Sequence, residues 1–67
     1  MEFRKGDMVY VKKSGTEGII LKFRGPFPKH DIPKQAVIYV TYTPFSTTNL
    51  HKNLAFNLGN LQAIGGK

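Results

Sequence analysis

Apolar and polar residues alternate with a period of two in several short segments of this chain, which is typical of β-strands with one buried face. Residues 8–12 and 18–24 show this pattern first, and residues 35–43 form the stretch richest in β-branched and aromatic side chains. Shorter strands are expected around residues 54–56 and over residues 61–64. No long window carries a helical stripe, so the pattern predicts an all-β fold of five strands.

The alternation also assigns each side chain of the first three strands to a face of the sheet. Val9 and Val11 are expected to point inward from the first strand. The inward set of the second strand is expected to be Ile19, Leu21 and Phe23. The outward positions then belong to Tyr10 and Lys12, to Lys22 and Arg24, and to Tyr39 and Thr41.

Turn-forming residues separate the predicted strands. Residues 13–16 are expected to form a turn, and a second loop is expected over residues 45–51. Residues 25–34 contain three of the four prolines. Because proline lacks an amide donor, this segment is predicted to be a long ordered loop rather than a central strand. Residues 57–60 are expected to form a single 3₁₀ turn just before the last strand.

The chain has 67 residues and no cysteine, which limits how it can be stabilised. A chain this short forms one domain, here residues 1–67 with an ordered core at 4–64, and buries only about 60% of its unfolded surface. Any binding site should therefore be shallow or shared between protomers. Disulfides and thiolate zinc sites are excluded, and a weak homo-oligomer would add stability. With no leader-like run and nothing near the roughly 18 apolar residues of a membrane span, we expect a cytoplasmic protein.

Ten Lys and Arg residues against four Asp and Glu residues give a net charge of +6. An excess of this size favours an anionic partner, and we expect nucleic acid or an acidic protein rather than a membrane. The alternative is that the charge serves solubility alone, as it does in many small domains.

A Lys-Gly-Asp opening at residues 5–7 precedes the first strand, and a turn, a glycine-started apolar strand, a long loop and a late single turn follow. This order resembles the SH3-like small β-barrels, which include KOW-type domains and a small protein of photosystem I. The resemblance covers residues 4–64 and implies a five-stranded barrel in which the first three strands are neighbours. The photosystem I protein is also similar in the Thr- and Asn-rich segment at residues 46–49, which implies a basic face that docks acidic electron carriers.

A local resemblance to the plasmid-borne type II dihydrofolate reductases lies at residues 6–9 (Gly-Asp-Met-Val) and 12–15 (Lys-Lys-Ser-Gly). It implies that Lys12 would line a pore shared between protomers. That family also needs a Val-Gln-Ile-Tyr segment, where this chain has Asn-Leu-Ala-Phe at residues 53–56. The Gln and Tyr that contact cofactor and substrate are absent, so we expect no NADPH-dependent turnover, no cofactor and no enzyme activity.

The two histidines do not complete a metal or catalytic site in the sequence. His30 and His51 lie in separate polar loops, with no cysteine and no His-x-His spacing. The neighbours His30 and Asp31 do not form an oriented acid–base couple merely by adjacency. No catalytic residue and no metal ligand is predicted.

Basic residues stand beside aromatic residues at the outward positions, which predicts a nucleic-acid-binding platform. Lysine and arginine would neutralise phosphates, and a tyrosine ring that stacks on a base contributes about 1–3 kcal/mol. The competing interpretation is a solvated face on which the tyrosines only cover the sheet. The residues assigned to the platform are Tyr10, Lys12, Lys13, Lys22, Arg24, Lys29, Lys34 and Tyr39.

The two long loops suggest a different surface for a protein partner. Phe27 and His30 in one loop, with Phe45 and His51 in the other, would form a docking edge for an apolar or acidic protein. A phenylalanine flanked by prolines can instead fold over the end of a barrel as a plug, and this is the expectation for Phe27 and Phe45.

Overall fold

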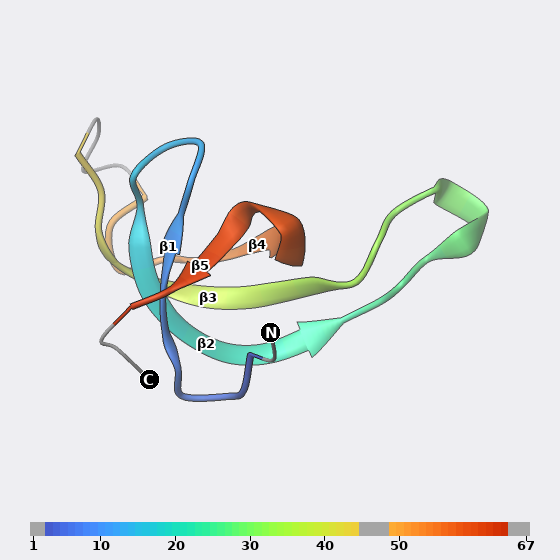
Figure 1. Cartoon of the computed structure of the whole chain (residues 1–67), viewed down its shortest axis with the longest axis horizontal. Helices are drawn as coiled ribbons and strands as arrows, with labels where there is room; N and C mark the ends of the chain where they lie inside the picture. Colours follow the sequence, from blue (N-terminus) through green and yellow to red (C-terminus); the bar gives the residue numbers. More distant parts are fainter. Residues whose placement is uncertain (1–2, 45–48, 65–67) are drawn as a thin grey trace.

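The computed structural model describes residues 3–44 and 49–64 of the chain. Its strands form one antiparallel sheet in the order β4-β3-β2-β1-β5 (Figure 1). These strands are β1 (Met8–Val11), β2 (Glu17–Arg24), β3 (Gln35–Tyr42), β4 (Asn53–Asn57) and β5 (Leu61–Ala63). The 3₁₀ turn η1 (Pro28–His30) lies between β2 and β3, and η2 (Leu58–Asn60) immediately precedes β5. The predicted all-β fold, with five strands and a 3₁₀ turn before the last, is confirmed.

The sheet is bent but not closed. Figure 1 shows β2 curving strongly along its length, with β1 and β3 as its hydrogen-bonded neighbours on either side. The edge strands β4 and β5 follow one another through η2, and no pairing joins them within the part of the chain that the structure describes. The predicted barrel is therefore an open, curved sheet.

The core lies on the inner side of this curved sheet. Val9 and Val11 are buried there, which confirms their predicted inward orientation. The other buried hydrophobic residues are Ile20, Ala36, Ile38, Val40 and Leu61. Phe3, Phe23, Leu54, Phe56 and Leu58 pack against this cluster while staying partly exposed. Burial of this apolar surface is the main stabilising contribution available to so small a domain.

The inward residues of β2 differ from the predicted set of Ile19, Leu21 and Phe23. Ile20 is the buried residue in the first half of the strand, with 1% of its surface exposed, whereas Leu21 is 42% exposed. Phe23 does pack against the core, as predicted. The two halves of β2 thus follow alternations of opposite parity.

A β-bulge at Leu21 causes this change of parity. Ile20 pairs with Ile38 of β3, and Lys22 pairs with the adjacent residue Val37, so Leu21 is the extra residue of β2. An extra residue in one strand restarts the alternation on the opposite face. The prediction assumed an unbroken strand and therefore assigned Ile19 and Leu21 to the wrong side.

The loop between β2 and β3 is an arm that projects away from the rest of the sheet (Figure 1). Phe27 and Ile32 exchange two backbone hydrogen bonds, with N to O distances of 2.8 and 3.1 Å. The turn η1 and the left-handed residue Asp31, with φ of 58°, close the tip. The segment is an ordered loop, as predicted. Because Phe27 pairs with Ile32 in this arm instead of packing on the core, its expected role as a plug is wrong, and Phe45 lies outside the described residues.

Candidate nucleic-acid interface

The outer face of β1, β2 and β3 is the side of the sheet opposite the core. Directly paired residues on neighbouring strands point to the same face, so the register defines rows of side chains across the sheet. One row contains Gln62, Tyr10, Glu17 and Tyr42. The next row contains Met8, Ile19, Tyr39 and Asn53. Both rows lie on the outer face because Val9, between Met8 and Tyr10, is fully buried.

Aromatic and apolar side chains fill the middle of this outer face. Met8, Tyr39 and Tyr42 are exposed, and Tyr10 and Ile19 are half-buried. A group of exposed apolar side chains on a domain of this size is typical of a binding surface. The tyrosines predicted for the platform are thus open to solvent, Tyr39 more so than Tyr10.

Tyr39 forms a stacked pair with His51. The two ring centroids are 5.9 Å apart and the ring planes differ by only 7°. The backbone amide of His51 donates a hydrogen bond to the carbonyl oxygen of Val40 at 2.8 Å, which fixes this turn beside β3. His51 has a left-handed backbone with φ of 63°, a conformation that costs a non-glycine residue about 1–2 kcal/mol. The fold therefore keeps an unfavourable backbone conformation at the residue that extends the Tyr39 ring surface.

The predicted cations lie at both ends of the outer face. Lys12 and Lys13 are exposed in the turn that follows β1, next to the row of Tyr10. Lys22 and Arg24 are exposed on β2 beyond the bulge. At about 3.3 Å per residue, the two groups are separated by on the order of 20 Å along the strands. The arrangement is a track, with rings in the middle and positive charge at each end.

Lys29 and Lys34 do not belong to this track, contrary to the prediction that grouped them with it. Lys29 is part of η1 at the tip of the arm. The Lys34 ammonium lies 5.1 Å from the centre of the Phe23 ring, which packs against the core. Lys34 therefore covers the inner rim of the sheet.

The docking edge predicted from the two loops is not a single surface. Phe27 and His30 lie in the projecting arm, whereas His51 lies beside Tyr39 at the other end of β3 (Figure 1). Phe45 is outside the described residues. The structure thus separates the residues of the alternative site and brings His51 to the platform instead.

Tyr42 and His51 were not predicted as members of the platform. A register shift beside Glu17 leaves Thr41 as an extra residue of β3, and its Oγ1 donates a hydrogen bond to the Glu17 carbonyl oxygen at 3.3 Å. Strict alternation from Tyr39 would place Tyr42 on the inner face. The bulge turns Tyr42 outward, and no feature of the sequence indicates that bulge.

Other site chemistries were also considered for residues 3–44 and 49–64. Nowhere in these residues do three or more His, Cys, Asp or Glu side chains gather closely enough to hold a metal ion. The helical segments found there are short, and none has the length and hydrophobicity needed to cross a membrane.

The outer face combines a stacked ring pair, exposed apolar neighbours and flanking cations, which suits a ligand with flat rings and anionic groups. No family model, curated protein or solved structure compared with this chain matches it.

Proposed function

We propose that this chain binds single-stranded nucleic acid along the outer face of β1, β2 and β3. The observation that carries the proposal is the stacked Tyr39–His51 pair, which lies between two groups of cations. A base that stacks on such a ring contributes about 1–3 kcal/mol, and each lysine near a phosphate adds a salt-dependent attraction. The net charge of +6 favours the same class of partner.

A single strand fits this face better than a duplex does. Within a duplex each base stacks on its neighbours, so no base face is free to contact Tyr39. In a single strand the bases can turn toward aromatic side chains while the backbone follows the cations. The separation of the two cation groups matches a short site, at the lower end of the range of about 4–16 nucleotides known for small β-barrel folds.

The test of this proposal is the salt dependence of binding by lysine variants. Lys12→Ala and Lys22→Ala are each expected to weaken binding to an oligothymidylate by a similar factor. Each should lower the slope of log K against log salt by about one unit, because one phosphate contact is lost. Fluorescence anisotropy titrations at several salt concentrations measure both quantities.

Lys34→Ala provides the matched control for these variants. It removes the same charge, but from a side chain that covers Phe23 on the inner rim, so the slope should change little. An equal change of slope in all three variants would mean that binding follows net charge and not the outer face. An absence of binding even at low salt would contradict the proposed function.

Glu17 offers a second test because it is an acidic residue within the track, between Tyr10 and Tyr42. Its carboxylate repels a phosphate that passes over this row, so Glu17→Gln should tighten binding several-fold at low salt. The gain should shrink at higher salt as the repulsion is screened. Unchanged affinity in Glu17→Gln at low salt would show that the strand does not cross this part of the face.

An acidic protein is the other partner that the net charge allows, and a base-free polyanion separates the two candidates. Polyphosphate carries the charge of a nucleic acid but has no bases to stack. If the rings of the outer face take part, the oligothymidylate should bind several-fold more tightly than polyphosphate at the same salt concentration. Equal affinities would favour a purely electrostatic partner.

A further inference from the structure

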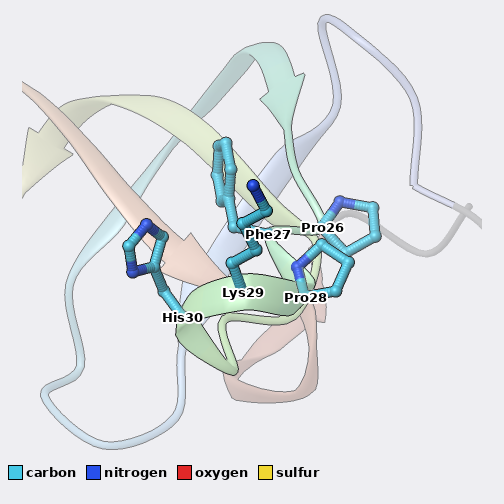
Figure 2. A pocket seen from close by; sticks show the side chains of 5 residues that line it. All are labelled: Pro26, Phe27, Pro28, Lys29 and His30. Atoms are coloured by element: carbon cyan, nitrogen blue, oxygen red, sulfur yellow. The ribbon is translucent and has the colours of Figure 1, made fainter.

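The tip of the arm between β2 and β3 surrounds a shallow hollow of about 350 Å³. Figure 2 shows Phe27 standing between His30 on one flank and the two prolines on the other, with Lys29 beside it. The lining is mostly apolar. Its residues are Pro26, Phe27, Pro28, Lys29 and His30.

The backbone holds this tip in a defined shape. Besides the two bonds between Phe27 and Ile32, the His30 amide donates to the Phe27 carbonyl oxygen at 3.1 Å. The Asp31 amide donates to the Pro28 carbonyl oxygen at 3.2 Å. Proline rings restrict the backbone further. A hollow formed by such a constrained turn binds with a smaller loss of conformational entropy than a flexible loop would.

The surroundings of the hollow are positively charged and continuous with the outer face. The guanidinium carbon of Arg24 lies 5.2 Å from the centre of the Phe27 ring, so this residue links the outer face of β2 to the arm. Lys29 lines the hollow itself, and Asp31 is the acidic residue of the segment 24–34. A ligand suited to this place carries a flat apolar group for the hollow and a negative charge for its rim.

We propose that the arm tip binds one unpaired base of the same strand that crosses the outer face. The base fills the hollow against Phe27 and His30, and the neighbouring phosphates face Lys29 and Arg24. This inference rests on the proposed function. At about 3.3 Å per residue, Phe27 lies on the order of 20 Å from Tyr39 along β3 and the arm, so the two bound bases are several nucleotides apart.

An abasic scan tests this second contact. The probe is the shortest oligothymidylate that keeps full affinity, so that it binds in one register, and single abasic sites are placed at each position in turn. The unchanged protein should show two sensitive positions, several nucleotides apart. Removal of the base at either position should weaken binding roughly 5- to 100-fold.

Two variants assign the sensitive positions to their protein partners. Phe27→Ala should abolish the sensitivity at the position bound by the arm and leave the other position sensitive. His30→Ala should reduce the same sensitivity, and because His30 is exposed its replacement preserves the fold of the arm. Tyr39→Ala should give the opposite pattern.

The possible failures are distinct. A single sensitive position that neither Phe27→Ala nor His30→Ala alters would overturn the arm contact while leaving the outer-face proposal intact. Two sensitive positions that both respond only to Tyr39→Ala would do the same. Failure of every oligothymidylate to bind would overturn the proposed function together with this inference, and an acidic protein partner would then be the class to examine.

Discussion

Gly18→Ala is expected to destabilise the fold by about 1–3 kcal/mol, because the site has no room for a methyl group. A Cβ atom at Gly18 would fall against the carbonyl oxygen of Tyr39 and within 3.2 Å of Cδ1 of Ile38. The carbonyl belongs to the backbone of β3 and cannot move away without disturbing the pairing of β2 with β3. For a domain of this size the loss corresponds to a fall in melting temperature on the order of 10 °C.

Gly59→Ala is the matched control for this substitution. Gly59 lies in η2, and a Cβ atom there would meet no other atom within 4 Å. Its stability should therefore stay within about 0.5 kcal/mol of the unchanged protein. Thermal and urea unfolding followed by circular dichroism compares the variants, and similar melting temperatures for both would contradict the close approach of β2 to β3 at Gly18.

The same close approach connects the fold to the proposed binding surface. Gly18 pairs with Val9 on one side and with Val40 on the other, so it lies where three neighbouring strands meet. The absence of a side chain there lets the backbone of Tyr39 come close to β2. The ring of Tyr39 points to the opposite face, and its position depends on this packing.

Much of the fold follows from local patterns in the sequence. The alternation around Val9 and Val11 identifies β1 and its buried face, and the β-branched and aromatic run identifies β3 almost to its ends. Proline at Pro26, Pro28 and Pro33 keeps the segment between β2 and β3 out of the sheet. These features are local because they depend on one strand's own side chains or on the backbone chemistry of single residues.

The errors arise where the pairing between strands decides the outcome. Bulges at Leu21 and Thr41 shift the register of β2 against β3, and each reverses the face of the residues that follow. An isolated strand gives no indication of such a shift. For this reason the sequence placed Leu21 inside and missed Tyr42 on the outer face.

The candidate site was predictable only in part for a related reason. Tyr39 follows from the alternation of β3, whereas its stacking partner His51 comes from a turn in a separate loop. That turn lies against β3 through the bond from the His51 amide to Val40. Because the pair exists only after β3 and β4 have come together, no spacing in the sequence reveals it.

Tyr39→Ala is expected to weaken binding of an oligothymidylate by about 1–3 kcal/mol without altering the salt slope. A ring that stacks on a base contributes this much, and its removal releases no counterions. Tyr39 is 36% exposed, so its replacement leaves the core intact. The combination of lost affinity and unchanged slope separates this variant from Lys22→Ala, in which both quantities change.

Substitutions at His51 test whether its strained backbone serves binding. Glycine adopts a left-handed conformation readily, so His51→Gly should remove the strain and leave the melting temperature equal or slightly higher. The same variant removes the ring stacked on Tyr39 and should weaken binding several-fold. His51→Asn also tolerates this conformation and should likewise bind weakly while remaining stable. A fall in melting temperature with unchanged affinity in both variants would show that His51 supports the fold alone, because a residue kept only for stability would lose none by the relief of strain.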